Sequence, residues 1–391
     1  MEKPLLKSLV SQKINSLAPE LKELALDLWN HPETAWQEFY SVESICNLLE
    51  RHDLAAAPGY CDIATAFRCE YGSEKAPAFA LAAEYDALAT GHACGHNLIA
   101  AASAGAMLAA VEIMKEHNIP GKLVLLGTPA EESGSAKVKM VEKGVLDNIG
   151  AVMMAHPGWC TIPDRGSLAI RRYDVTFHGR SSHAAGSPEL GINALDAVMM
   201  LFTAVNFQRQ QMPEFCRIHG IVTNGGVMPN IIPEKAGCRF YLRSAREDWM
   251  EILDRRFDDM VRGAAQLTGT TFTKEKFSTD CRSRKPNAAL NEAFVEIMTE
   301  LGESISPIPT AGRASSDFGD FSQIIPGAHP YFAISDRRIG AHSEEFKEAA
   351  RSVSGLDNML KAANALAYTA LLYMTDEVYR AKVQSNFTGC R

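Results

Sequence analysis

Three short apolar runs, each followed by residues that bind metals or move protons, constrain the fold of this chain most. Residues 78–83, 122–127 and 151–155 contain almost no polar side chain. A continuous apolar run of this length is typical of a strand buried on both faces, because a half-exposed strand alternates apolar and polar residues. The sequence therefore predicts a sheet that is covered on both sides.

The segments between these runs predict helices, at about residues 97–116 and 138–143. An alternation of strand, helix and strand is typical of right-handed crossovers in a mostly parallel sheet. In such sheets ligands bind at the carboxyl ends of the strands. We therefore expect the polar segments that follow the three runs to meet at one edge of the sheet.

The first two polar segments contain residue types that suit a metal site. Residues 91–96 read Gly-His-Ala-Cys-Gly-His, and the alternate spacing of Cys94 and His96 can direct a thiolate and an imidazole at one point. These groups suit Zn²⁺ or a similar ion. Glu131 and Glu132 follow the second run, and on extended backbone they point to opposite sides, so one can bind metal while the other faces a bound water.

Two histidines and an aspartate extend this set. His156 ends the third run and precedes Pro157, so it cannot enter a regular helix at once. His342 follows the strand-like residues 330–334. Asp86 could orient a ligand imidazole by accepting its second N–H. A thiolate, imidazoles and carboxylates together indicate metal-assisted hydrolysis.

Each segment alone has a plainer interpretation. The cysteine could be a small buried core residue, and the paired glutamates could be the solvated start of a helix. The two histidines could be ordinary polar residues, and the aspartate could belong to a turn. Only their combination at the ends of successive strands favours a buried metal pair.

The sequence pattern changes near residue 167. Residues 171–178 alternate like a half-exposed strand, and the following segments give the order β-α-β-β-α-β, typical of a small split-βαβ sandwich. Helix and buried strand return from about residue 284. We predict a discontinuous catalytic domain of residues 1–166 and 284–391, with residues 167–283 inserted as a second domain.

The inserted domain carries weaker candidates. His183 lies among small residues after a strand and could polarise a substrate carbonyl, while Asn230 and Arg243 could bind substrate. A guanidinium can hold a carboxylate with two hydrogen bonds. Their plainer interpretations are a loop histidine, a turn amide and a surface cation. Ser244 and Glu247 fit a capping box at the start of the next helix.

Composition argues against several classes of function. The formal net charge is −8 and no segment is dense in Lys or Arg, so we expect neither nucleic acid nor membrane as a partner. The longest apolar stretch, residues 98–114, is interrupted by Ser103 and Glu112 and is too short to span a bilayer. The first residues do not resemble a signal peptide, and nine scattered cysteines predict reduced thiols and a cytoplasmic location.

Together these short sequence motifs resemble those of the M20 metallopeptidase family, and most closely those of its amidohydrolase and aminoacylase branch, subfamily D. The resemblance covers nearly the whole chain in the family's order. The matching strings lie at residues 83–88, 91–97, 127–132, 183–185, 230–233, 316–320 and 341–343.

The resemblance implies an α/β fold, with a mostly parallel sheet that carries a dinuclear metal site and an inserted α+β, ferredoxin-like lid that mediates dimerisation. It implies two divalent cations, Zn²⁺ or Mn²⁺. Glu131 would be the general base that makes the attacking hydroxide, and His183 would cross to the partner's site to steady the oxyanion. The ligands implied are Cys94, His96, Glu132, His156 and His342.

Two departures bear on the substrate. Asn97 stands where aminoacylases have aspartate, and Ala341 stands where a second histidine is common; both variants resemble the branch of aminobenzoyl-glutamate hydrolases and β-alanyl dipeptidases. We expect a homodimeric amidohydrolase, dipeptidase or aminoacylase that cleaves an amide bond of an N-acyl amino acid or small dipeptide-like substrate. Two alternatives stay open: amide synthesis at the same site in a biosynthetic pathway, and a catalytically silent binding protein on this scaffold.

Overall fold

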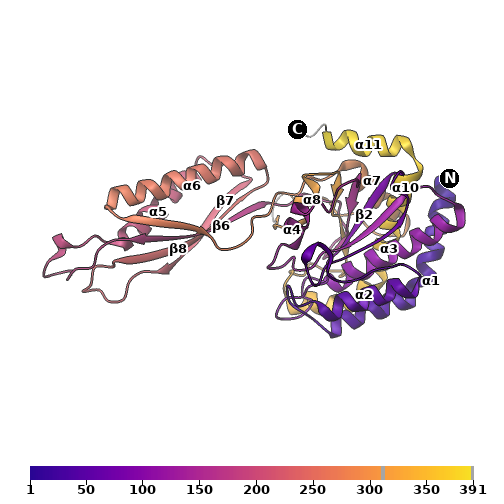
Figure 1. Ribbon diagram of the computed structural model, residues 1–391, viewed down its shortest axis with the longest axis horizontal. Helices are drawn as coiled ribbons and strands as arrows, with labels where there is room; N and C mark the ends of the chain where they lie inside the picture. Colours follow the sequence, from indigo (N-terminus) through magenta and orange to yellow (C-terminus); the bar gives the residue numbers. More distant parts are fainter. Residues whose placement is uncertain (310–312, 389–391) are drawn as a thin grey trace. The chain divides into compact units, whose positions relative to one another are not determined.

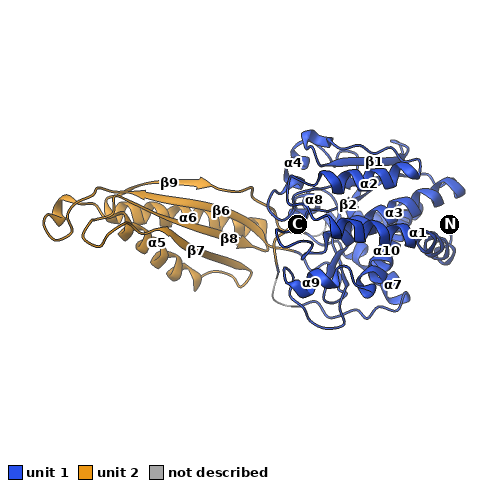
Figure 2. Ribbon diagram, turned by 90° about the horizontal axis from the view of Figure 1, so that it is seen from below, with its two compact units in different colours: residues 1–166, 285–313, 317–391 blue, residues 167–284, 314–316 orange. Residues whose placement is uncertain are grey.

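The computed structural model describes residues 1–309 and 313–388, and the chain divides into two compact units (Figure 2). Unit 1 comprises residues 1–166, 285–313 and 317–391, and unit 2 comprises residues 167–284 and 314–316. The short later segment joins unit 2 because the N–H of Leu168 donates to the carbonyl of Ala314 (2.9 Å).

Unit 1 is built around a five-stranded sheet with the order β1-β3-β2-β4-β10. β1 runs antiparallel to β3, and the other neighbours are parallel, so the predicted mostly parallel sheet is confirmed. The strands are β1 (Phe67–Gly72), β2 (Ala78–Ala83), β3 (Lys122–Gly127), β4 (Ala151–Met153) and β10 (Gly327–Ala328), and a separate parallel pair joins β5 (His156–Gly158) to β11 (Tyr331–Ala333).

Helices surround this sheet (Figure 1). The helices of unit 1 are α1 (Lys3–Asn30), α2 (Phe39–Arg51), α3 (His96–His117), α4 (Ala136–Glu142), α7 (Ala288–Glu300), α8 (Phe318–Ser322), α9 (Glu344–Ala349), α10 (Val353–Thr375) and α11 (Glu377–Thr388), with the short 3₁₀ turn η1 (Tyr60–Asp62).

The central strand β2 shows why the apolar runs are continuous. Phe79 and Leu81 belong to the core formed with α1, α3 and α10, whereas Ala80 and Ala82 belong to the core on the other face, which contains residues of α4 and α8. Alternate side chains of a strand point to opposite faces. Both faces are covered, and every position of β2 is therefore buried.

The most apolar helix, α3, is the central helix of unit 1. The expectation that this apolar stretch is too short to span a bilayer is wrong, because α3 is the one helix among the described residues that is long and apolar enough to cross a membrane. Yet 94% of its apolar window is buried inside the protein. It packs between α1 and α10 in the main core. Its composition is therefore explained by burial in that core.

Unit 2 is a four-stranded antiparallel sheet with the order β7-β8-β6-β9. Helices α5 and α6 share one core with it, to which Tyr173, Val175 and Phe177 of β6 contribute in alternation. The strand order is that of the split-βαβ arrangement. Its elements are β6 (Ala169–His178), η2 (Pro188–Leu190), α5 (Ala194–Arg209), β7 (Cys216–Asn224), β8 (Lys235–Ser244), α6 (Glu247–Thr268) and β9 (Thr271–Lys276).

The predicted capping box at α6 is wrong. Ser244 is the last residue of β8, and its hydroxyl accepts from the N–H of Arg246 and donates to the carbonyl of the same residue. Arg246 is the N-cap, and the carboxylate of Glu247 accepts instead from the N–H of Ser283 (2.6 Å). The strand runs further than the sequence pattern indicates, so the helix begins too late for that motif.

Among the described residues no two cysteines form a disulfide with each other. Cys390 lies outside the described residues. Their arrangement agrees with the expected reduced thiols, and the cytoplasmic location stays a prediction.

Candidate metal centre and active site

The candidate residues of unit 1 gather at the carboxyl ends of β2 and β3, which are hydrogen-bonded neighbours in the sheet. The segment after β2 supplies Glu84 and Asp86, and the loop after β3 supplies Glu131 and Glu132. The N–H of Glu132 donates to the carboxylate of Asp86 (2.9 Å). The two strand ends are therefore joined directly at the site.

The turn before α3 brings Cys94 and His96 to the same place. Gly95 has a φ of +76°, and a Cβ there would lie 2.6 Å from Cγ of Pro157. Glycine is required both by the left-handed backbone and by this close approach. The approach also brings in His156, whose Nε2 lies 3.6 Å from Sγ of Cys94.

The five expected ligands form two overlapping groups. The ligand atoms of Cys94, His96 and His156 lie within 4.8 Å of one another, and so do those of Cys94, Glu132 and His342. Oε1 of Glu132 is 3.6 Å from Nε2 of His342 and 3.9 Å from Nε2 of His96. The structure thus brings all five side chains together, with Cys94 common to both groups.

His342 is the exposed member of the cluster. Its φ of +66° is uncommon for a residue other than glycine. Its N–H donates to the carbonyl of Ala93 (2.9 Å), which ties its loop to the turn that carries Cys94. A backbone contact therefore holds this histidine in place.

The cluster fits a divalent cation. Within the described residues, nothing hydrogen-bonds to the buried Nε2 of His96 or the buried Oε1 of Glu132. Nδ1 of His96 contacts Asp86 at 3.1 Å, which leaves Nε2 available to a ligand. Buried polar atoms normally have partners, and one thiolate, three imidazoles and a carboxylate suit Zn²⁺ or a similar ion.

Burial and charge shift the pKa values in this cluster. Burial alone would lower the pKa of His96, but the charges of Cys94 and Asp86 raise it well above its usual range. Burial raises the pKa of the Cys94 thiol, against the opposing effect of His96. Burial, then the neighbouring carboxylates, raise the pKa of Glu131. A cation would displace protons from such a site when it binds.

Glu131 adjoins a second group of charges. One oxygen each of Glu84, Glu131 and Asp317 lies within 4.8 Å of the others. The fully buried Lys137 places Nζ 2.7 Å from Glu84 and 2.7 Å from Asp317. Burial raises the pKa of Asp317 to about 6, with Lys137 opposing. Sequence reasoning missed the roles of these neighbours, because no local pattern records the pairing of Lys137 with Glu84 and Asp317.

A buried glutamate supports the loop that carries Glu131. Oε1 of Glu38 accepts from the N–H groups of Trp36 (3.0 Å) and Ala130 (2.9 Å), and Oε2 accepts from the hydroxyl of Thr65 (2.9 Å). Ala130, directly before the paired glutamates, has a φ of +58°. Glu38 thus holds a strained residue of the loop, and no signal in the sequence marked it.

The remaining predicted residues lie in unit 2. His183 is exposed, and its Nδ1 accepts from the N–H groups of Ala185 (3.2 Å) and Gly186 (3.0 Å). A neutral imidazole that accepts at Nδ1 carries its proton on Nε2, so this ring offers a donor to solvent. Asn230 is close by, since its carbonyl accepts from the residue after His183 (3.0 Å).

Arg243 lies apart from these two residues. It sits near the end of β8, whereas Asn230 precedes the first residue of that strand. Eight residues of extended strand span roughly 26 Å. The guanidinium donates to the hydroxyl of Ser315 (3.0 Å), and burial, with Arg172, lowers its pKa. Within unit 2 the structure does not bring Arg243 together with His183 and Asn230.

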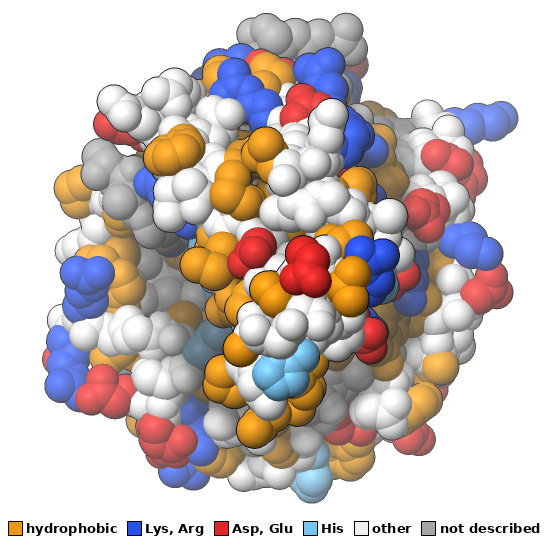
Figure 3. All heavy atoms as spheres, turned by 90° about the vertical axis from the view of Figure 1, so that its left-hand side faces the viewer, with side chains coloured by type: hydrophobic (Ala, Val, Ile, Leu, Met, Phe, Trp, Pro, Cys, Tyr) orange, Lys and Arg blue, Asp and Glu red, His pale blue; other side chains and the backbone are white. Residues whose placement is uncertain are grey.

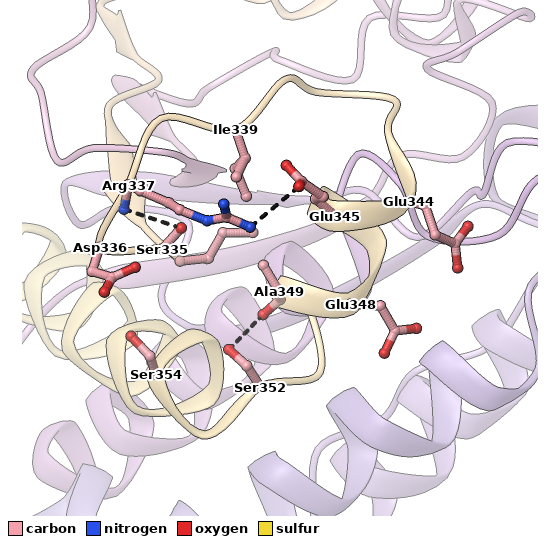
Figure 4. Close-up of a pocket in the computed structure, with 11 residues that line it drawn as sticks. Ser335, Asp336, Arg337, Ile339, Glu344, Glu345, Glu348, Ala349, Ser352 and Ser354 are labelled. Atoms are coloured by element: carbon pink, nitrogen blue, oxygen red, sulfur yellow. Dashed lines mark hydrogen bonds and ion pairs between the residues drawn. The ribbon is translucent and has the colours of Figure 1, made fainter.

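A hollow of about 780 Å³ in unit 1 lies beside the loop of His342 (Figure 4). Three of its four carboxylates already have basic partners within unit 1, because Glu345 pairs with Arg337, Glu344 with Lys347 and Glu348 with Arg351. Its charge is therefore largely neutralised, and we assign no ligand to it.

Comparison with known proteins adds independent information. Residues 80–371 match the model of "Peptidase family M20/M25/M40". The chain is 37% identical over 391 aligned residues to the Xaa-Arg dipeptidase of Mus musculus, covering 95% of this chain and 89% of that protein. It is 32% identical over 300 residues to one of the subunits of the p-aminobenzoyl-glutamate hydrolase of Escherichia coli K12, covering 72% of this chain and 62% of that protein.

A solved structure shares the fold. A dinuclear metal-binding peptidase of the M20 family from Bacillus subtilis superposes with a TM-score of 0.71 at 18% identity. The match covers 92% of this chain and 99% of that one. The likeness therefore extends over both units.

Proposed function

This chain belongs to peptidase family M20/M25/M40, a hydrolase of peptide or amide bonds, and we propose from that premise that it is a binuclear metallohydrolase of small dipeptide-like or N-acyl amino acid substrates. One observation carries the proposal. Cys94, His96, Glu132, His156 and His342 come from distant segments, and their ligand atoms form two groups that share Cys94. A silent scaffold has no need of such a set beside a free carboxylate.

The paired glutamates have different roles at this centre: one is a metal ligand and the other is the general base. Two divalent cations, when bound, supply electrophilic activation of the carbonyl and acidify a water molecule. Glu132 adjoins the imidazoles of His96 and His342, so it serves as a ligand. Glu131 places an oxygen within 4.8 Å of ligand atoms of His96 and Glu132, and it also adjoins the carboxylates of Glu84 and Asp317. It takes a proton from the water and passes it to the leaving amine, a task for which a raised pKa is suited.

Asp86 and His183 complete the proposed chemistry. Asp86 accepts from Nδ1 of His96 and so fixes the tautomer that presents Nε2 to a cation. His183 offers its Nε2 proton, and a donor of that kind stabilises the oxyanion of a tetrahedral intermediate. We assign His183 and Asn230 to the site of a partner copy, and Arg243 to the substrate carboxylate.

The surface of unit 2 supports a homodimer in which this unit acts as the lid. β7 is an edge strand, and its Ile221 and Val222 are 62% and 49% exposed. Met199 and Phe207 of α5 are exposed as well. Figure 3 shows hydrophobic side chains exposed among polar and charged ones on the face that it draws. An unpaired edge with exposed apolar residues favours pairing with a second copy.

The relatives suggest which substrates to try first. One is named for dipeptides that end in arginine, and another for an aminobenzoyl amide of glutamate. We therefore propose small amides of an amino acid whose carboxylate is free, tested with Xaa-Arg and Xaa-Lys dipeptides before N-acyl amino acids. Zn²⁺ and Mn²⁺ are the proposed cations.

The test combines metal analysis with a substrate panel read by mass spectrometry. Wild-type protein loaded with Mn²⁺ or Zn²⁺ is compared with Glu131→Gln and with Glu142→Gln, an exposed glutamate of the same unit. Glu131→Gln should keep its cations and lose turnover by about 10²- to 10⁴-fold, while the control stays active.

Each remaining outcome has a definite meaning. Normal turnover by Glu131→Gln would remove Glu131 from the mechanism. Failure of the wild type to cleave any amide would favour the silent binding protein. An amide product from amine and acid at high concentration, with no net hydrolysis of the panel, would favour the biosynthetic direction.

A further inference from the structure

Lys137 is a buried cation to which the proposed chemistry gives no role. Its side chain is fully buried at the start of α4. Nζ lies 2.7 Å from Oε1 of Glu84 and donates to Oδ1 of Asp317 (2.7 Å), while its backbone N–H donates to Oδ2 of Asp317 (3.1 Å). Burying a charge is costly unless it is well paired. These three contacts are the pairing that allows Lys137 to be buried.

The partners of Lys137 lead to both halves of the centre. Oε2 of Glu84 lies 3.5 Å from Nε2 of His96, the nitrogen that is available to a cation. Glu84 and Asp317 each place an oxygen within 4.8 Å of an oxygen of Glu131. One ammonium is therefore connected through single carboxylates to an expected ligand and to the expected base.

The ammonium of Lys137 pairs with two of the three neighbouring carboxylates. In the described part of the chain it pairs with Glu84 and Asp317 and lies beyond 4.0 Å from Glu131. Two of the three acids are thus held at fixed positions. The third carboxylate, Glu131, is therefore the one that can exchange a proton with a molecule bound at the centre.

Rigid elements hold this arrangement. Glu84 directly follows the buried strand β2, and Asp317 is the N-cap of α8. Residues of α4 and α8 share one apolar core, with Met140 and Phe318 fully buried in it. The charges therefore cannot separate without movement of packed secondary structure.

We infer that Lys137 is a positioning residue of this centre: through Glu84 it fixes the surroundings of His96, and through Glu84 and Asp317 it keeps Glu131 free for proton transfer. The part that concerns Glu131 rests on the proposed function. The part that concerns His96 does not, because it predicts cation binding in the absence of substrate.

The first test uses Co²⁺, whose absorption spectrum reports its ligands. Lys137→Met keeps the length of the side chain and removes the charge. We expect it to weaken Co²⁺ binding by about 10- to 100-fold and to change the spectrum, as loss of an outer hydrogen-bond partner does. Lys137→Arg should recover part of the affinity.

A matched control separates this role from general stability. Lys122 is also nearly buried and pairs with Glu70 and Glu74, but it begins β3 at the other end of the sheet. Lys122→Met should leave the affinity and spectrum of Co²⁺ unchanged. The double variant Lys137→Met with Asp317→Asn removes one of the two buried carboxylates that lose their cation and keeps Glu84, so it carries the same test if the single variant does not fold. Wild-type Co²⁺ binding in either variant would overturn the inference.

The second test is a double-mutant cycle with Glu131→Gln on the substrate that the panel finds. Lys137→Met should lower kcat by about tenfold or more and change KM by no more than about threefold. In the Glu131→Gln background the same substitution should cost little further, because both act on one proton transfer. Additive losses would contradict the link to Glu131. If the wild type cleaves no amide, the proposed function fails and the Co²⁺ result still decides the role of Lys137.

Discussion

The candidate residues of the two units differ in burial and in how they are held. In unit 1 the ligands follow strand ends, and His96 is fully buried against Asp86 (3.1 Å). In unit 2, His183 and Asn230 are exposed, and their hydrogen bonds join them to backbone groups close by. A centre whose groups are held by packed neighbours is ready to bind, whereas exposed groups act only when a second surface meets them.

Large apolar side chains are exposed in both units, for example Val353 and Val378 in unit 1. In unit 2 several of them lie on the edge strand β7 and on α5. The comparison predicts that substitutions of the ligands of unit 1 and of the residues that orient them change metal binding, and that substitutions of the unit 2 candidates change catalysis or assembly without loss of metal. The experiments below test that division.

Of the substitutions that test this division, His183→Ala should have the largest effect. We expect kcat to fall by about 10²- to 10³-fold, as when one oxyanion donor is removed, with both cations retained. Steady-state kinetics and metal analysis measure the two quantities. Mixing this variant with Glu131→Gln should restore about a quarter of the sites if His183 acts across a dimer. Absence of any restored activity would place His183 in the site of its own chain.

Asp86→Asn should weaken cation binding by about 10- to 100-fold. In the wild type one carboxylate oxygen of Asp86 contacts His96 and the other accepts from the N–H of Glu132. The amide removes the negative charge that faces His96 and replaces one of these two acceptor oxygens. Competition with a chelator measures the affinity. Asp62→Asn, on an exposed carboxylate, is the control. Equal affinities would show that Asp86 does not orient the ligand.

Glu38→Leu should lower the free energy of unfolding by about 1–3 kcal/mol for the buried N–H group left without an acceptor, and by less for the partly buried one. The groups concerned belong to Trp36 and Ala130, so turnover should fall as well. Glu38→Gln keeps one acceptor and should lose much less. Denaturant unfolding with parallel kinetics measures both. Full activity of a folded Glu38→Leu would separate this loop from catalysis.

The smallest effect concerns a charge network in unit 2. Asp254 contacts Arg171 (2.5 Å) and Lys274 (3.3 Å); burial alone would raise the pKa of Asp254, but these cations lower it. A depressed carboxyl pKa adds stability above its ordinary value near 4 that is lost as the pH falls through the lowered value. Asp254→Asn should reduce, by about 1 kcal/mol, the free energy of unfolding that the protein loses as the pH falls. Thermal unfolding between pH 6 and pH 2 measures this dependence. If the substitution leaves it unchanged, the network does not contribute to stability.

The sequence predicts the parts of this molecule that depend on local pattern. β2 and β3 have the predicted bounds because every one of their residues is buried, which makes the apolar runs unbroken. Cys94, His96 and Glu132 were recognisable because they come after such runs. The predicted third run was too long, since β4 ends at Met153 and His156 instead begins β5. Glu38 and Lys137 were not recognisable, since their partners Ala130 and Asp317 lie 92 and 180 residues away and no local pattern records a pairing across that distance.

The most direct measurement of the central claim is anomalous X-ray scattering from crystals of the protein loaded with Zn²⁺ or Mn²⁺. We predict two peaks within bonding distance of the five side chains, with Sγ of Cys94 near both. Cations bound elsewhere, or a loaded crystal with no peak at Cys94 and His96, would contradict the account.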